Sequence, residues 1–368
     1  MFWKLLKMDW VIVVPVLLIL SIGILVLYSL STAGLEQAVF VKQIVFAAIG
    51  IVGMFVIALA DYHYFNAYSR KIYFVSIGIL LLVLFFGTAV RGTAGWIGFG
   101  SLKVQPVEFV KIGLIIFLAS FISQKKASLQ EFQRLIVSFI LTAVIVLLVL
   151  RQPDLGSAVI LGGIWFGMIF VSGISRKSFL IITVTAILVG TLSWSYLADY
   201  QRNRILNFLD PTFDVKGAGY NVHQAMVAVG SGGLTGKGIG HGSQSQLNFL
   251  PEKHTDFIFA AVAEELGIAG VLFVLVLYLA LFYRLKVIAS LAQDNFGYLV
   301  VAGIMTMLFL QVLINVGMNI GLVPVTGIPL PFLSYGGSSL LSLLLALGIV
   351  LSVNERKDAS SAKATHSY

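Results

Sequence analysis

The segment GYNVHQAMVAVGSGGLTGKGIGHGSQSQLNFLPEKHTDFIFAAVAEELGIAG, residues 219–270, is the polar interruption around which this chain is organised. It begins as a glycine-rich loop, passes through a cluster of His, Lys, Glu and Asp, and enters an apolar run that already has charged residues on it. The chain on both sides consists largely of long apolar runs. A long polar segment in such surroundings indicates a site, and Asp256 lies where the polar part meets the apolar part.

The composition is that of a membrane protein. Of the 368 residues, 59% are hydrophobic and 11% are charged, whereas soluble domains have about 25% charged residues. A stretch of about 20 apolar residues spans the hydrocarbon core of a bilayer, where its backbone must satisfy its own hydrogen bonds as a helix. We therefore expect one all-α bundle. The absence of cysteine excludes disulfides and thiolate metal sites, and the net charge of +8 does not indicate nucleic-acid binding, because the basic residues are scattered.

The apolar runs predict a bundle of about ten transmembrane helices in a single domain, residues 1–353. The first run follows Lys4 and Lys7 without a small-residue cleavage site, so we interpret it as a retained membrane helix. The predicted spans are Trp10–Leu30, Val39–Ala60, Ile72–Val90, Val107–Ile122, Phe132–Leu150, Leu155–Val171, Phe179–Leu197, Phe257–Tyr283, Leu299–Ile320 and Phe332–Val353. Residues 354–368 are polar and rich in Ser, Ala and Lys, which predicts a disordered cytoplasmic tail.

The basic residues predict the orientation of this bundle. With the N-terminus in the cytoplasm, 14 of the 24 Lys and Arg residues fall in cytoplasmic segments, and five of the other ten lie in the long loop 198–255. Because the positive-inside rule depends on short loops, the pattern favours both termini inside. The loop 198–255, between the seventh and eighth predicted helices, then faces outward with loops 91–106 and 321–331. We expect any chemistry at this outer face.

Asp256 is the first candidate for a functional carboxylate. The simplest alternative is that it caps the helix that follows, since a carboxylate accepts hydrogen bonds from free amides at a helix start. Capping does not explain why charged residues crowd the same entry, or why Glu264 and Glu265 lie two turns further along the apolar run. Ionisable residues inside a span are costly and are functional by default. We interpret Glu264 and Glu265 as supporting residues, one of which tethers a neighbouring helix.

Glu108 and Lys111 form a second candidate pair. They are three residues apart near the start of the fourth predicted span and so share one helix face. One interpretation is a buried pair that neutralises itself. The other is that Lys111 also contacts a second carboxylate and tunes its charge, with Asp256 as the candidate. Asp154, in the turn between the fifth and sixth spans, is placed to cap the sixth helix.

Other motifs are weaker. The glycine run 230–242 does not match a nucleotide-binding loop, because Ser231 and Gly238 stand where glycine and a hydroxyl residue are required. It is instead predicted to be a mobile, substrate-facing loop whose amides are free to hold phosphate oxygens. The histidines are spaced too irregularly to indicate zinc, and no nucleophile elbow of a hydrolase is present in the sequence. Residues 315–339, with three prolines, predict irregular backbone near membrane depth.

These segments together resemble the SEDS family, which includes RodA, FtsW and SpoVE, over nearly the whole chain. The motifs that carry the resemblance are QPDLGSA at 152–158, LPEKHTDFIFA at 250–260 with the following EELG, and NVGMNIGLVPVTGIPLPFLSYGGSS at 315–339. Residues 217–238 are more similar to the elongation members than to the division members. Two departures are Gly95 before Trp96, where the family usually has arginine, and Val107 in QPVE, where it usually has serine.

The resemblance implies a peptidoglycan glycosyltransferase that polymerises lipid II at the outer face of the bacterial cytoplasmic membrane during cell elongation. Asp256 matches the family's essential aspartate and is expected to be the general base, with Lys111 and Glu108 as catalytic support. The candidate substrate-binding residues are Arg202, Arg204, Lys237, His254, Lys253, Gln152 and Ser334. No cofactor is certain, and a divalent cation, Mg or Mn, is one source of the positive charge that a departing diphosphate requires.

The resemblance also implies a class B penicillin-binding protein, which is a transpeptidase, as a partner, together with other proteins of the elongation machinery. Two alternatives stay open at this point. One is a lipid II flippase, since broken helices and intramembrane charges suit a transporter. The other is a non-catalytic scaffold for the transpeptidase. A flippase is expected to distribute polar groups along a path through the bilayer, whereas here they concentrate at the predicted outer end.

Overall fold

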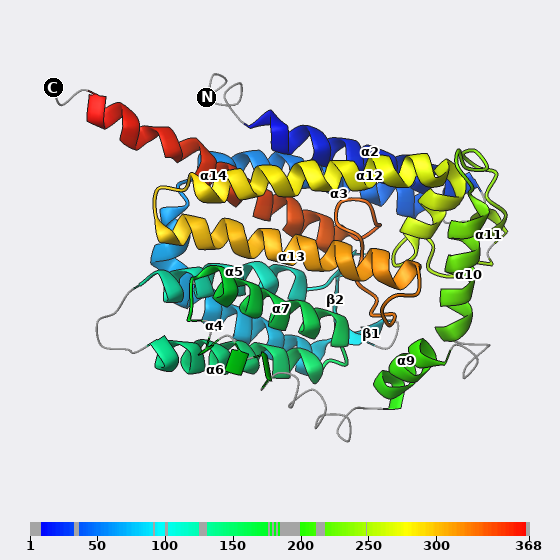
Figure 1. Cartoon of the computed structure of the whole chain (residues 1–368). Coiled ribbons are helices and arrows are strands. Elements are labelled where there is room, and N and C mark those ends of the chain that lie inside the picture. Colours follow the sequence, from blue (N-terminus) through cyan, green and yellow to red (C-terminus); the bar gives the residue numbers. More distant parts are fainter. Residues whose placement is uncertain are drawn as a thin grey trace.

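The structure is a computed structural model that describes residues 9–32, 37–90, 93–99, 102–124, 131–175, 177–178, 180–181, 183–184, 199–210, 218–247 and 249–365. It is a bundle of long helices (Figure 1). The bundle helices are α2 (Trp10–Thr32), α3 (Gln37–Leu59), α4 (His63–Phe86), α5 (Val107–Ser123), α6 (Glu131–Leu150), α7 (Leu155–Val171), α12 (Ile258–Ser290), α13 (Asn295–Asn319) and α14 (Gly337–Thr365).

The described part of the chain contains seven helices that are long and apolar enough to cross a membrane, namely α2, α3, α4, α6, α12, α13 and α14, and α7 is a shorter apolar helix. The protein is therefore a helical, multi-pass membrane protein, as the composition predicts. The predicted span Phe179–Leu197 lies almost wholly outside the described residues. The count of ten thus stays a prediction.

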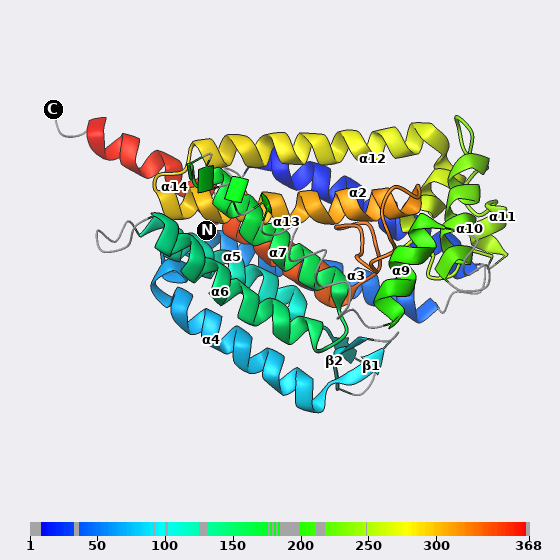
Figure 2. The same cartoon turned by 60° about the horizontal axis from the view of Figure 1, so that its bottom comes forward.

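The start of α2 and the end of α14 lie at one end of the bundle, and shorter helices gather at the other end (Figures 1 and 2). These are α9 (Asp199–Leu209), α10 (Ala218–Ser231) and α11 (Ser243–Gln246), so the predicted long loop 198–255 contains helical segments. Among the seven long spans, α14 and α13 are the most enclosed, with 78% and 61% of their most apolar stretches buried, against 22% for α3. The C-terminal end of α13 therefore offers a rigid support to whatever packs on it.

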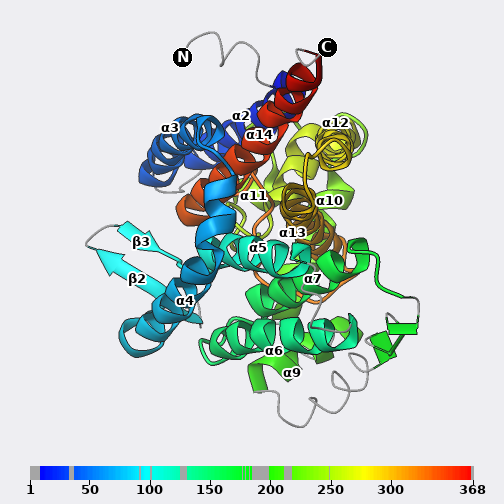
Figure 3. The ribbon, with the colours of Figure 1, turned by 90° about the vertical axis from the view of Figure 1, so that its left-hand side faces the viewer.

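A small antiparallel sheet follows α4, where helix was predicted up to Val90. Helix α4 ends at Phe86, and β1 (Thr88–Val90), β2 (Thr93–Phe99) and β3 (Leu102–Val104) pair in that order. Figure 3 shows the sheet beside α4, at the edge of the bundle. The turn at Gln152 anchors it, because the amide of Ala94 donates to the Gln152 carbonyl at 3.1 Å and the Gln152 side chain donates to the Leu80 carbonyl at 3.0 Å.

Helix α12 is broken near its start, where one continuous apolar span was predicted. Gly267 has a φ of 68°, a left-handed conformation that glycine tolerates. The loop after α10 fills the break: the amides of Lys237 and Gly238 donate to the carbonyls of Glu264 and Glu265, both at 3.0 Å. In return, the amides of Ile268 and Ala269 donate to carbonyls of the same loop. Residues 258–266 are thus a separate short helix in front of the long one.

Helix α14 also has different bounds from those predicted. It begins at Gly337 and not at Phe332, because residues 330–336 form turns closed by hydrogen bonds from the amides of Leu333 and Ser334 to the Leu330 carbonyl, at 3.2 and 3.0 Å. At its other end the helix continues to Thr365, into the stretch that was predicted as a disordered tail. Alanine and lysine in that stretch are good helix formers.

Candidate functional site

The turn at residues 251–257 presents Asp256 at the end of the bundle where α9, α10 and α11 lie. Helix α12 begins at Ile258, with Phe257 as its N-cap residue and no side-chain cap. Asp256 is thus the residue directly before the N-cap position of this helix. It lies in a hydrogen-bonded turn, in which the amides of Thr255 and Phe257 both donate to the Glu252 carbonyl, at 3.1 and 3.3 Å.

Two asparagines at the end of α13 hold this turn from below. The side-chain amide of Asn315 donates to the Asp256 carbonyl at 2.9 Å, and that of Asn319 donates to the same carbonyl at 3.1 Å. The Asn319 oxygen accepts the amide of Ala260 at 3.1 Å. Both asparagines are fully buried, so the start of α12 is fixed to α13 through bonds that are shielded from water.

The segment 330–336 holds the turn from the side. The hydroxyl of Ser334 donates to the Thr255 carbonyl at 2.7 Å, and the amide of Tyr335 donates to the His254 carbonyl at 2.9 Å. Gln43 of α3 fixes this segment in turn, since its side-chain amide donates to the Ser334 carbonyl at 3.1 Å. The three successive carbonyls of residues 254–256 are thereby all held by other segments.

The Asp256 side chain faces a glycine. A Cβ atom built on Gly327 would lie 3.5 Å from Asp256 Oδ2, and Gly327 has a φ of +74°. The Asp256 side chain is half-buried. The neighbouring residue Ile328 is tied to the same asparagine, because Asn315 also donates to its carbonyl, at 2.8 Å. The carboxylate thus lies against the backbone at Gly327 and stays partly exposed. We call the segment around Gly327 the wall of the Asp256 site.

The glycine run 230–242 is bound to Glu264 and Glu265, a correction to the predicted free amides. The Glu264 carboxylate accepts Lys237 Nζ at 2.8 Å and the amides of Gln244 and Ser245 at 2.8 and 2.9 Å. The amides of Lys237 and Gly238 are occupied by the backbone of α12. These amides therefore hold carboxylate and carbonyl oxygens of the protein instead of substrate phosphate.

Glu265 ties this loop to α2, as predicted for one of the two glutamates. Its carboxylate accepts the Ser29 hydroxyl at 2.6 Å and the Gln246 side-chain amide at 2.9 Å. Lys253 is buried next to these groups and donates to the Ser245 carbonyl. Burial lowers the pKa of Lys253 below its ordinary value, and the nearby charges of Glu265 and Glu264 oppose this shift. The basic groups of this region serve first to hold the loop together.

Lys111 pairs with Glu108. Its Nζ lies 2.7 Å from Glu108 Oε1, and both side chains are buried. Among the described residues, Lys111 makes an ion pair with Glu108 and none with Asp256. The turn after α6 is also as predicted at Asp154, whose carboxylate accepts the amide of Ser157 at 2.9 Å. Gln152 is buried and engaged with α4.

The remaining predicted residues lie around the same end of the bundle. Arg204 of α9 contacts the Thr326 carbonyl at 3.5 Å and lines a small cavity of about 50 Å³ with residues of α10 and of the segment 321–325. Arg202 lies on the same helix and is half-buried. The His254 ring lies 5.9 Å from the ring of Tyr335. Arg204 therefore reaches the segment that carries Gly327, the wall of the Asp256 site.

The described residues contain no group of three or more His, Asp or Glu side chains placed to hold a metal ion. The carboxylates of Glu264 and Glu265 accept hydrogen bonds from side chains of the loop 232–247.

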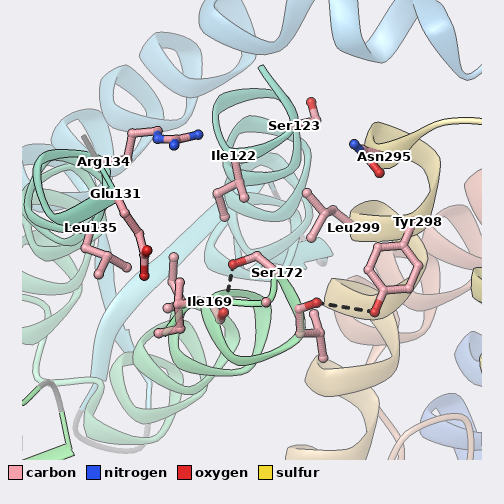
Figure 4. Close-up of a pocket in the computed structure, with 13 residues that line it drawn as sticks. Ile122, Ser123, Glu131, Arg134, Leu135, Ile169, Ser172, Asn295, Tyr298 and Leu299 are labelled. Atoms are coloured by element: carbon pink, nitrogen blue, oxygen red, sulfur yellow. Dashed lines mark hydrogen bonds between the residues drawn. The ribbon is translucent and has the colours of Figure 1, made fainter. Parts of the chain in front are cut away.

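A larger cavity, of about 380 Å³, lies at the opposite ends of the helices that support Asp256. Residues from the end of α5, the start of α6, the end of α7 and the start of α13 line it. Figure 4 shows Glu131 and Arg134 of α6 on one side and Asn295 and Tyr298 of α13 on the other. It is separate from the Asp256 site.

The supporting residues Asn315, Asn319, Gln43 and Gly327 were not singled out from the sequence. One signal was present: two asparagines four residues apart on an apolar helix share a face and require partners when buried. Nothing local indicated that the partners would be carbonyls some 60 residues earlier in the chain.

Comparisons with known proteins agree over nearly the whole chain. A family model described as "Cell cycle protein", for FtsW, RodA and SpoVE, matches residues 8–359. The chain is 38% identical to the peptidoglycan glycosyltransferase MrdB of Escherichia coli K12, over 97% of this chain and 96% of that protein. It is 39% identical to the stage V sporulation protein E of Bacillus subtilis, over 94% of this chain and 96% of that protein.

Solved structures show the same fold. A chain from a peptidoglycan synthase complex, described as coordinating polymerization and crosslinking, is similar with a TM-score of 0.81 and 32% identity, covering 95% of this chain and 98% of that chain. The rod shape determining protein RodA of Thermus thermophilus is similar with a TM-score of 0.71 and 29% identity, covering 95% of this chain and 97% of that chain.

Proposed function

The chain belongs to the FtsW, RodA and SpoVE family, and we propose that it is a peptidoglycan glycosyltransferase that polymerises lipid II into glycan strands during cell elongation. Relatives bear the name peptidoglycan glycosyltransferase, which supports the reaction class. The observation that carries the assignment of the site is the clamp on residues 254–256, which holds the Asp256 backbone while its carboxylate stays half-buried.

We propose the following topology for this function. About ten helices cross the cytoplasmic membrane of a bacterium with both termini inside, and residues 198–255 lie outside between the seventh and eighth helices. The distribution of basic residues supports this orientation. Asp256 then lies at the outer boundary of the membrane, where a lipid-linked disaccharide presents its sugars while its tail stays among the helices.

Asp256 acts as the general base of the transfer. The 4-hydroxyl of the acceptor sugar attacks C1 of the donor glycan, the bond between C1 and the diphosphate oxygen breaks, and the hydroxyl proton passes to the Asp256 carboxylate. A neutral hydroxyl is a poor nucleophile, and a positioned base accelerates such a transfer by about 10²–10⁴-fold. The clamp contributes by keeping the carboxylate in place before substrate binds.

The departing diphosphate requires positive charge. Arg204 is the best placed of the candidates, because it reaches the Thr326 carbonyl next to Gly327, and Arg202 lies on the same helix. Lys237 and Lys253 are already engaged with Glu264 and the Ser245 carbonyl, so we assign them to the integrity of the site. Ser334 and His254 act through the clamp, and Glu108 and Lys111 through the packing of α5.

A class B penicillin-binding protein is the proposed partner. The similar chain from a peptidoglycan synthase complex that coordinates polymerization and crosslinking supports this proposal. A membrane transpeptidase bound to this chain places crosslinking next to the emerging glycan strand.

The decisive experiment is Asp256→Asn in the purified full chain supplied with lipid II. Glycan strands are expected from the parent protein and a loss of at least about 100-fold from the variant, since the amide cannot take the proton. Asp210→Asn, an exposed residue just after α9, is the matched control and is expected to retain activity. Unimpaired polymerisation by Asp256→Asn removes the general-base role, and an absence of strands from the parent with lipid II transport intact favours a flippase.

A further inference from the structure

A cavity of about 280 Å³ opens between α4, α5 and α6, at the end of the bundle away from Asp256. Its wall is apolar and largely aromatic, formed by Tyr73, Phe74, Phe117, Phe121 and Leu141. Its rim is polar, formed by Ser69, Arg70, Ser120, Gln124 and Arg134. Phe74 is 69% exposed, so the cavity opens on the lipid-facing side of α4.

The uncharged polar groups of the rim satisfy one another. The hydroxyl of Ser69 donates to that of Ser120 at 2.9 Å, and Ser120 donates to Asn66 Oδ1 at 2.7 Å. The Gln124 side-chain amide donates to Ser120 at 3.2 Å. These groups need no ligand, and they fix the ends of α4 and α5 on which the cavity is built.

The two arginines differ from the rest of the rim. Among the described residues, neither Arg70 nor Arg134 makes an ion pair, a hydrogen bond or a contact with an aromatic face. The closest acid in sequence to Arg134 is Glu131, and its carboxylate accepts the amide of Ser175 at 2.8 Å. Residues 125–130, which connect α5 to α6, are KKASLQ and contain no acid. Two uncompensated guanidinium groups thus stand at the mouth of an apolar cavity.

Arg134 also lines the 380 Å³ cavity between α5, α6, α7 and α13 (Figure 4). It therefore stands between two hollows and is half-buried. A half-buried arginine that makes no ion pair among the described residues is costly unless an anion compensates it. Guanidinium groups bind phosphate oxygens through two parallel hydrogen bonds. The phosphodiester of a lipid headgroup offers such oxygens.

We propose that this cavity binds an anionic phospholipid, with its phosphate on Arg70 and Arg134 and an acyl chain against the aromatic wall. Basic pockets between transmembrane helices recognise anionic headgroups, and the charge and the apolar wall select for both parts of such a lipid. Lys71 and Lys177 at the same end of the bundle are exposed and add to the attraction of an anionic leaflet. This site is distinct from that of the glycosyl donor.

Native mass spectrometry of the full chain in detergent tests this proposal. Phosphatidylglycerol is titrated against phosphatidylcholine with the same acyl chains, and glycerol 3-phosphate is added in a separate arm. The parent protein is expected to retain phosphatidylglycerol preferentially, and Arg70→Gln/Arg134→Gln is expected to lose about 10- to 30-fold in affinity, since each basic residue contributes roughly a factor of five. Glycerol 3-phosphate is expected not to compete, because it lacks the chains.

Lys71→Gln/Lys177→Gln removes the same charge from the same end of the bundle and is the matched control, with an expected change of less than about threefold. Leu141→Trp fills the cavity without changing the charge and is expected to abolish selective binding, with the melting temperature checking that the protein is folded. Equal loss in the two charge variants, equal retention of both lipids, or displacement by glycerol 3-phosphate overturns the proposal. So does a photo-crosslinker at Phe74 that captures a protein instead of lipid in native membranes.

Discussion

The side-chain amide of Asn315 donates to the carbonyl of Asp256 at 2.9 Å. The same amide group donates to Ile328 at 2.8 Å, so one residue near the end of α13 joins the turn that presents the carboxylate to the segment that forms its wall. Because Asn315 is fully buried, water cannot replace these bonds when they are lost. The geometry around Asp256 therefore depends on a buried residue of α13.

Asn315→Ala is expected to lower both stability and polymerisation. The variant leaves the Ile328 carbonyl without this donor and leaves the Asp256 carbonyl with the donor Asn319 alone. An orphaned buried group costs about 1–3 kcal/mol. We expect a fall in melting temperature and a loss of activity of more than about tenfold, because a small displacement of a catalytic group is costly. Asn203→Ala, exposed on α9, is the control. Parent-like activity of Asn315→Ala at a temperature where it is folded contradicts the positioning role.

A thermodynamic cycle on Glu108 and Lys111 separates structure from catalysis. Removing one member of a buried ion pair costs about 3–5 kcal/mol, whereas replacing both with neutral residues is often nearly neutral. Glu108→Gln and Lys111→Met are each expected to lower the melting temperature, and the double variant is expected to recover it. An active double variant shows that the pair supports packing only, while a stable but inactive one assigns Lys111 to the reaction.

Gly327→Ala is expected to impair activity beyond the cost of its backbone strain. Its added Cβ lies in ordinary van der Waals contact with Asp256 Oδ2, at 3.5 Å, and so covers part of the carboxylate. At a φ of +74° a non-glycine residue also costs about 1–2 kcal/mol. Gly233→Ala has a similar φ, +57°, and meets nothing within 4 Å, so it has the strain without the contact. Equal loss of polymerisation rate in the two variants, measured at equal folded fraction, argues against a wall at Gly327.

Stability is expected to rise with pH in the alkaline range because of Lys253. Burial lowers the pKa of this lysine below its ordinary value of 10.5, so between the two values the unfolded state binds more protons than the folded state. The free energy of unfolding then increases with pH across that window. Melting temperatures measured at a series of pH values up to 10.5 are expected to show this rise in the parent and a flatter profile in Lys253→Met. Identical profiles contradict it.

Local sequence was sufficient for features whose partners are close along the chain. The cap at Asp154 and the pair of Glu108 with Lys111 each span three residues, and periodicity and charge predict them directly. The apolar runs likewise identify most of the long helices, since membrane spans depend on length and hydropathy. The sequence predicted that one of the two glutamates tethers a neighbouring helix, because a buried carboxylate requires a partner. It did not identify that partner as Ser29 of α2.

The rest depends on contacts between distant segments. The break of α12 at Gly267 is stabilised by loop residues some 30 positions earlier, and nothing in an apolar run such as 258–283 indicates an interruption. The sheet after α4 was missed because its strands are short and its anchor is the turn at Gln152. The clamp on residues 254–256 joins distant segments, and two of its donors, Asn315 and Asn319, each lie between apolar neighbours in the sequence.

The interruption at Gly267 has a mechanical consequence for the membrane setting. A long helix adapts to changes in bilayer thickness by tilting. If α12 were continuous, such a tilt would displace its N-terminal end, which follows Asp256. Instead, the helix is broken at Gly267. The short helix that follows Asp256 is held to α13 by the hydrogen bond from the Ala260 amide to Asn319. The start of α12 is thereby fixed to α13, so we expect the position of the Asp256 carboxylate to change little when the thickness of the bilayer changes.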